Sequence, residues 1–205
     1  MEIDPLLDDL EKIKSLYKTG NGSETVDELF NSVNKRIHLL KTENEIVENV
    51  NNALASRIET NDFYLIVCDE LYKMIKWDRV SIAIFEEALG IVTAFVLTKG
   101  FKTKVFPEKR NYSYKGSILE KIMETGEAVI INDTSKNILQ TDKIHFKEGT
   151  LSRLAYPLKF NGKIVGSINF SSKNKNAFSK EQFSVLSKLS PVLAFIVNDN
   201  LEKEI

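Results

Sequence analysis

Polar side chains alternate with apolar ones along residues 152–172, and they are the first candidates for binding chemistry in this sequence. The Asn-Gly pair at 161–162 favours a tight hairpin turn, because both residues tolerate positive φ. Alternation with a period of two predicts two strands with one apolar face and one more polar face. Ser167 and Asn169 lie on the polar face, and we expect Arg153 to join them there.

Arg153 has the most specific chemistry of this set. A guanidinium group binds a phosphate or a carboxylate through paired hydrogen bonds, so Arg153 is a candidate anchor for an anionic ligand. The sequence is equally consistent with an arginine that simply faces solvent.

No segment carries a recognised catalytic signature. The sequence contains no glycine-rich phosphate loop and no kinase, nucleophile-elbow or zinc-protease motif. His38 and His145 lie far apart in the sequence, and Cys68 is the single cysteine, so these residues form no recognisable metal motif. We expect Cys68 to be a small buried side chain rather than a redox thiol.

The composition excludes several other classes of protein. The chain has 205 residues, of which 42% are hydrophobic and 28% are charged, as is ordinary for a globular protein. It has no run of 18 apolar residues and no basic-then-apolar leader, so neither a membrane span nor export is expected. Arginine and lysine do not cluster as in a nucleic-acid-binding surface. We therefore expect a cytoplasmic protein without nucleic-acid or membrane partners.

A heptad repeat runs through residues 23–60. Residues recur at a spacing of seven in two series, a first series that begins at Val26 and a second series that begins at Phe30. The two series interleave by four and three, which is the pattern of a coiled coil. The dimerisation residues expected from it are Val26, Phe30, Val33, Ile37, Leu40, Asn44, Val47, Asn51 and Leu54, with Ile58 at the end. Buried asparagines such as Asn44 and Asn51 cost stability but favour two parallel strands in register. An amphipathic helix lying along its own domain is the alternative, but the long strict repeat favours a parallel homodimer.

The remaining patterns divide the chain into three parts. An Asp-Pro start and a Gly-Asn-Gly end predict an N-terminal helix within residues 1–22. After the coiled-coil helix, residues 61–205 mix strand and helix patterns in an order typical of an α+β domain. The expected elements are a helix over 63–75, strands over 79–85, 90–97 and 100–106, a helix over 118–123, a strand over 128–131, the hairpin, and a final helix after Ser179 that contains Pro191.

This order of elements resembles a known family. Pro157-Leu158 before the hairpin turn, residues 164–168 after it, and Phe178-Ser179 before the last helix are similar to the end of a GAF domain, a sensory module for small molecules. The resemblance covers residues from about 79 to the C-terminus. It implies a central antiparallel sheet with the first and last helices on one face and a ligand pocket on the other. The expected ligand contacts are Ser81, Phe85, Asp133, Thr134, Arg153, Ser167 and Asn169.

The resemblance also suggests a ligand. Asn174-Lys175 and Phe178 are similar to a motif of GAF domains that bind cyclic AMP or cyclic GMP, in which the Asn-Lys part supports the fold around the pocket. Here Glu181 comes early, and Gln182-Phe183 stand where the motif has an acidic pair. A cyclic nucleotide is therefore the leading candidate.

Other ligands of the family fit the sequence less well. His145 falls in the segment that covers the pocket, where some members hold haem through a histidine, but no second feature points to haem and we do not expect it. No cysteine follows Cys68, which argues against a covalently bound bilin and against a methionine sulfoxide reductase on this scaffold.

Our leading hypothesis is a non-catalytic GAF sensor at the N-terminus of a signalling protein. Residues 198–205 keep a helical, polar pattern without a stop signal, so we expect a C-terminal output domain such as a diguanylate cyclase, another nucleotide cyclase or a histidine kinase. The ligand would shift the packing of paired helices. The alternative is a structural dimerisation module whose pocket is filled by Phe85, Phe95 and Phe146.

Overall fold

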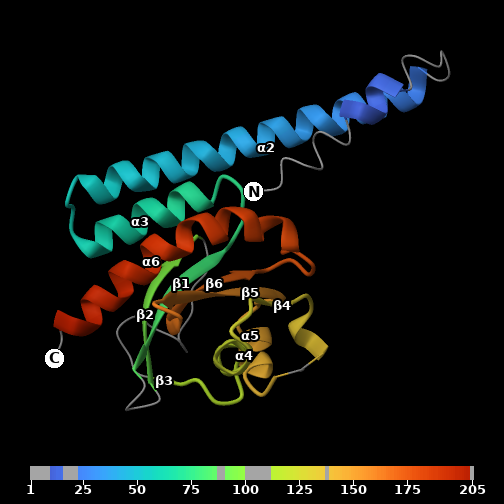
Figure 1. Ribbon diagram of the computed structural model, residues 1–205. Coiled ribbons are helices and arrows are strands. Elements are labelled where there is room, and N and C mark those ends of the chain that lie inside the picture. Colours follow the sequence, from blue (N-terminus) through green and yellow to red (C-terminus); the bar gives the residue numbers. More distant parts are fainter. Residues whose placement is uncertain (1–9, 16–22, 87–90, 100–111, 137–138, 204–205) are drawn as a thin grey trace. The chain divides into compact units, whose positions relative to one another are not determined.

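The chain divides into two compact units, and the boundary in the sequence falls between Ile46 and Val47. The structure, a computed structural model, describes residues 10–15, 23–86, 91–99, 112–136 and 139–203 (Figure 1). The two units are Met1–Ile46 and Val47–Ile205. The second unit holds the whole sheet and is the part that carries the candidate site.

Helix α2 (Ser23–Ala55) contains most of the predicted heptad repeat. The sequence predicts a helix that continues to residue 60, but the chain turns after Ala55, with Arg57 at φ 50°, and α3 begins at Thr60 (Thr60–Leu71). Ile58 therefore lies in the turn rather than on the helix. Asn49 of α2 donates a hydrogen bond to Glu70 of α3 at 3.0 Å, which links the two helices across the turn.

The two heptad series of α2 differ in exposure. Val33 of the first series is buried, whereas Phe30 and Ile37 of the second series are 57% and 37% exposed. Asn44 and Asn51, which continue the second series, are exposed as well. The second series therefore forms a line of side chains along α2 that is open to contact.

Among the described residues, six strands form one antiparallel sheet in the order β3-β2-β1-β6-β5-β4. The strands are β1 (Arg79–Glu86), β2 (Ile91–Thr98), β3 (Tyr112–Ser113), β4 (Val129–Ile131), β5 (Ser152–Phe160) and β6 (Lys163–Ser172). The strands expected at 79–85, 90–97 and 128–131 are confirmed, and the one expected at 100–106 lies outside the described residues.

The hairpin β5–β6 that the sequence predicts is part of this sheet. Asn161 and Gly162 have φ values of 49° and 78°, which confirms the expected turn. On its other side β5 pairs with β4 only from Arg153 to Ala155. Among the described strands, the remainder of β5, including Pro157, therefore has a neighbour on one side alone.

Helices cover both faces of the sheet. Helices α3 and α6 (Phe183–Lys203) lie on one face, and α4 (Ile118–Thr125) and α5 (Asp142–Lys147) lie on the other (Figure 1). This arrangement confirms the α+β fold, with the first and last helices of the domain on the same face. Within α6, Pro191 lacks an N–H for the carbonyl of Ser187, and the Ser190 hydroxyl donates to that oxygen at 3.3 Å instead.

The face toward α6 is the main apolar core. Its fully buried side chains include Ile82, Leu154, Leu158, Ile168, Phe170, Leu186, Leu189 and Leu193. Gly166 allows the backbones to approach closely, because a methyl group there would overlap the Ala83 carbonyl oxygen and lie 3.3 Å from Val197 Cγ1. The glycine is therefore required by packing between β6, β1 and α6.

The opposite face has a smaller apolar cluster under α4. The helix begins after Ser117, whose hydroxyl accepts the Leu119 N–H at 3.1 Å, and it ends at Gly126 with φ 68°. Its residues Ile118 and Ile122 pack against the sheet, together with Ala83, Phe85, Ile131 and Ala155. Beyond this cluster, the same face becomes polar.

Candidate functional site

Small polar side chains form the floor of the sheet face that carries α4 and α5. Ser81 of β1 is paired with Asn169 of β6, and Ala83 is paired with Ser167 in the next row. The Asn169 amide donates to the main-chain oxygen of Ser81 at 3.4 Å, and the Ser167 hydroxyl donates to Asn169 Oδ1 at 3.1 Å. The structure therefore brings three predicted site residues together, where they form hydrogen bonds with one another.

Two buried arginines extend this floor toward the end of the strands. Ser171 of β6 is paired with Arg79 of β1 on one side and with Arg153 of β5 on the other. Both arginines lie on the face of Ser81, because alternate residues of a strand share a face, and they are 5% and 7% exposed. Their Cα atoms are roughly 10 Å apart at ordinary strand spacing, so both cationic side chains reach the same region.

Helix α5 places a carboxylate beside one of these arginines. Asp142 is fully buried, and its Oδ1 lies 3.6 Å from Arg153 Nη1, which is too long for a hydrogen bond. Its Oδ2 accepts the Leu139 N–H at 2.9 Å. Within the described residues, neither Arg153 Nη1 nor Asp142 Oδ1 has a hydrogen-bond partner. The ion pair is therefore close but incomplete, whereas the best Arg–carboxylate pairs form two hydrogen bonds.

His145 completes a buried polar cluster, which we define as Arg79, Asp142, His145 and Arg153. His145 follows Asp142 by three residues, so both lie on the same side of α5, and it is 5% exposed. Burial lowers the pKa of His145 well below its usual value, and the cations of Arg153 and Arg79 lower it further. Burial also lowers the pKa of Arg153 to about 10, against the opposing effect of Asp142. The cluster therefore holds a neutral imidazole between charged groups at neutral pH.

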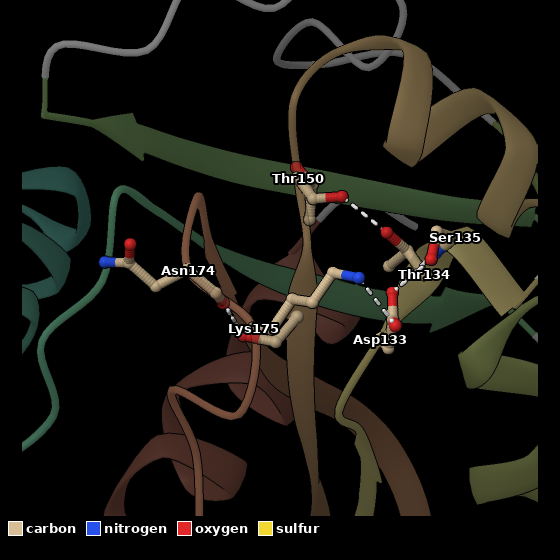
Figure 2. A network of polar contacts seen from close by, with 7 residues as sticks. Asp133, Thr134, Ser135, Thr150, Asn174 and Lys175 are labelled. Carbon is tan, nitrogen blue, oxygen red and sulfur yellow. Dashed lines mark hydrogen bonds and ion pairs between the residues drawn. The ribbon is translucent and has the colours of Figure 1, made fainter.

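A second network, near the ends of β4 and β6, involves two more predicted contacts. Asp133 accepts hydrogen bonds from the Ser135 hydroxyl at 2.6 Å and from Lys175 Nζ at 2.9 Å (Figure 2). These bonds lower the pKa of Asp133 to about 2, the bond from Ser135 having the largest effect. Thr134 is fully buried and donates to the Thr150 carbonyl at 2.6 Å. Both residues join the chain after β4 to neighbouring segments, and a role in ligand binding stays a prediction.

The aromatic residues that could fill the pocket have different positions. Phe85 is buried in the apolar cluster under α4, where its ring lies 6.5 Å from that of Tyr114. Phe95 faces the other side, with its ring 5.3 Å from that of Tyr64 on α3. Phe146 is 44% exposed on α5. Of these three, Phe85 is the one buried in the apolar cluster on the floor side of the sheet.

A groove of about 380 Å³ lies elsewhere, between the turn after α4, β5 and the start of α6. It is lined by Gly126, Glu127, Ala128, Tyr156, Pro157, Lys159, Lys180, Phe183 and Ser190. The Tyr156 and Phe183 rings meet edge to face at 5.8 Å in its wall, and partial burial raises the pKa of Tyr156. None of the predicted ligand contacts lines this groove.

Two residues of the cluster were missed by the sequence reasoning. Arg79 lies two residues before Ser81 on β1. The alternation that placed Ser81 on the polar face therefore places Arg79 there as well. Asp142 has no such signal, because it lies in a segment without a clear period between β4 and β5. Its place beside Arg153 follows from tertiary packing.

The other potentially reactive side chains form no second candidate site among the described residues. Cys68 is buried in α3, as expected from the sequence, and burial followed by the nearby Asp69 charge raises its pKa to about 12. Among the residues with described positions, no three His, Cys, Asp or Glu side chains gather as a metal ion requires. In the same part of the chain, no helix is long and apolar enough to cross a bilayer.

A sequence profile of the GAF domain matches residues 59–198. The chain belongs to the GAF domain family. GAF domains are typical of sensory and regulatory signalling proteins and are in general not catalytic. The matched region contains α3, the complete sheet and most of α6, and hence the entire buried polar cluster.

Solved structures show the same fold at low sequence identity. The GAF domain of an Acinetobacter phosphoenolpyruvate-protein phosphotransferase has a TM-score of 0.64 and 19% identity, and the match covers 82% of this chain and 98% of that one. The GAF domain of a two-component sensor histidine kinase from Bacillus halodurans has a TM-score of 0.60 and 15% identity, with 72% and 99% covered. A type II free methionine-R-sulfoxide reductase from Thermoplasma acidophilum has a TM-score of 0.54 and 20% identity, with 69% and 96% covered. No curated protein matches the chain in sequence.

Proposed function

We propose that this GAF domain is a cytoplasmic sensory module that binds a small anionic ligand on the sheet face covered by α4 and α5. The observation that carries the proposal is Arg153, a nine-tenths buried arginine whose Nη1 has no hydrogen-bond partner among the described residues. Burying an arginine without complete pairing costs stability, so such a residue is more readily explained by binding than by folding.

The ligand class follows from the geometry of a guanidinium group. Its donors are arranged in a plane and match two oxygens of a phosphate or a carboxylate. A cyclic nucleotide, either cyclic AMP or cyclic GMP, is the leading candidate, supported by the partial motif Asn174-Lys175 and Phe178. An amino acid would offer the same anionic contact through its carboxylate. The floor residues Ser81, Ser167 and Asn169 would then contact the rest of either ligand.

The helices would transmit the effect of ligand binding to an output domain. We propose a parallel homodimer through α2 that controls a downstream output domain, such as a diguanylate cyclase, another nucleotide cyclase or a histidine kinase. The exposed apolar side chains of Phe30 and Ile37 support the dimer, and the resemblance in fold to the GAF domain of a sensor histidine kinase is compatible with a kinase output. Binding would favour one packing of the paired helices.

The first test is a thermal-shift panel of cyclic nucleotides, other nucleotides and amino acids on the wild-type chain. A ligand at a hundred times its Kd adds about 2.7 kcal/mol of stability, which is a rise of several degrees in Tm. We expect the rise to disappear in Arg153→Met and to persist in Lys180→Met, which removes a cation from the separate groove instead. A rise lost in Lys180→Met alone would assign the ligand to that groove.

A structural dimerisation module is the second candidate function. Two observations favour it: the Phe85 ring is buried in the apolar cluster, and α5 covers Arg153. On this hypothesis, no member of the panel changes the Tm of either the wild-type chain or the Arg153 variant.

A further inference from the structure

Helix α5 is attached to the domain by polar rather than apolar side chains. The buried residues of this six-residue helix are Asp142 and His145. Its large apolar side chains, Ile144 and Phe146, are 38% and 44% exposed. A surface helix ordinarily buries its apolar face, and hydrophobic burial supplies most of its stability. The position of α5 therefore depends to an unusual extent on buried polar side chains, and the charged contact among them is the one between Asp142 and Arg153.

That contact leaves both partners incompletely bonded. The 3.6 Å separation of Asp142 Oδ1 and Arg153 Nη1 retains the attraction of opposite charges but forms no hydrogen bond. The Asp142 carboxylate cannot come closer freely, because its Oδ2 is bonded to the Leu139 N–H at 2.9 Å. A free anion has no such tether and can approach the guanidinium with two oxygens.

We propose that Asp142 is a built-in counterion that holds α5 over Arg153, and that an anionic ligand replaces it and releases the helix. This inference rests on the proposed function, because it names the regulation of the same site. In the unliganded domain, the Asp142 carboxylate keeps α5 over Arg153, and we call this the closed state. The ligand anion takes over the guanidinium, and the position of α5 then reports occupancy. A ligand must compete with Asp142, so its apparent Kd is raised by the small fraction of molecules that are open.

The decisive experiment tests whether a free anion can replace the carboxylate. Asp142→Ala removes the counterion and leaves space for a small anion beside Arg153. We expect sodium formate or acetate to raise the Tm of this variant relative to sodium chloride at equal ionic strength. The rise should be about 3–6 °C at ten times the Kd of the anion. The wild-type chain, in which Asp142 occupies the position, should shift much less.

Two matched variants identify where the anion acts. Asp142→Ala combined with Arg153→Met should lose the response to formate, because the guanidinium is gone. Asp133→Ala also removes a carboxylate from an ion pair, but its Lys175 partner is half exposed, so formate should not restore its Tm. Equal effects of formate and chloride on Asp142→Ala, or an equal response in Asp133→Ala, would overturn the proposal.

A second measurement separates this inference from the proposed function. Asp142→Asn keeps the side-chain size and an oxygen for the Leu139 N–H, and it should bind any ligand found in the panel about tenfold more tightly than the wild-type chain. Equal or weaker binding by this variant refutes the counterion mechanism while the sensor function stands. A third outcome is that formate raises the Tm of Asp142→Ala while no compound in the panel raises the Tm of the wild-type chain. That outcome supports the counterion mechanism and counts against a nucleotide or amino-acid sensor.

Discussion

At the scale of single residues, His145 is the titratable group most affected by its surroundings. It is buried, and the charges of Arg153 and Arg79 add to the cost of protonating it, so the folded state keeps its imidazole neutral. In the unfolded chain a histidine has a pKa of about 6.5 and binds a proton below that pH. The unfolded state therefore gains protons that the folded state cannot take up, and stability falls as the pH drops below about 6.5.

This linkage predicts a loss of about 1.4 kcal/mol in the free energy of unfolding between pH 7.5 and pH 5.5. Urea unfolding of the wild-type chain and of His145→Gln at these pH values measures it, and the variant should show a smaller loss. His38→Gln removes the other histidine, which is exposed on α2, and is the matched control substitution. The effect is distinct from that of Asp133, whose lowered pKa contributes stability that is lost only below about pH 4. Parallel pH profiles for all three proteins would contradict the prediction.

At the scale of elements, the predictable parts are those with a strong period. Alternation along β1 and β6 was sufficient to place Ser81, Ser167 and Asn169 on one face, and the Asn-Gly pair predicted the turn. The pairing of the hairpin strands could not be read from that turn, because a bulge between Leu158 and Lys159 shifts it by one residue. Helix α5 could not be placed in the same way. Its apolar side chains Ile144 and Phe146 are more exposed than its polar Asp142 and His145, so hydropathy assigns the wrong side to the core. Asp142 meets Arg153 only through packing between distant segments.

Close packing of β6 between β1 and α6 gives a prediction at this scale. Gly166→Ala should destabilise the domain by about 1–3 kcal/mol, because the added methyl group forces β6 away from the Ala83 carbonyl. Gly162→Ala is the matched control: its Cβ would meet nothing within 4 Å, and its cost is limited to about 1 kcal/mol from the positive φ. Urea unfolding compares the two, and an equal or larger loss in Gly162→Ala would refute the packing argument.

At the scale of the whole molecule, α2 belongs to both compact units, and its exposed series is the proposed contact with a second copy. In a parallel dimer, Phe30 and Ile37 would face their equivalents, followed by the paired Asn44 and Asn51. The strict seven-residue spacing made this series visible in the sequence. Its exposure could not be predicted, because either series could have been covered by the chain itself.

The dimer is tested by changing one side chain of that series. Ile37→Glu should convert a dimer into a monomer at micromolar concentration, because like charges would face each other across the contact. Leu39→Glu is the control, since Leu39 is similarly exposed at 40% but lies outside the series. Light scattering on both variants and on the wild type gives the masses. A monomeric wild-type chain, or equal effects of the two substitutions, would refute this interface.

Pro157 lies in the part of β5 that, among the described strands, has a neighbour on one side only. A long free strand edge invites pairing with another molecule and is a common origin of aggregation. Pro157 has no N–H to offer such a pair, and Lys159 adds a charge two residues further along. This edge therefore resists strand-to-strand aggregation. In the proposed dimer, two copies could then be held at high local concentration while the helices alone make the contact.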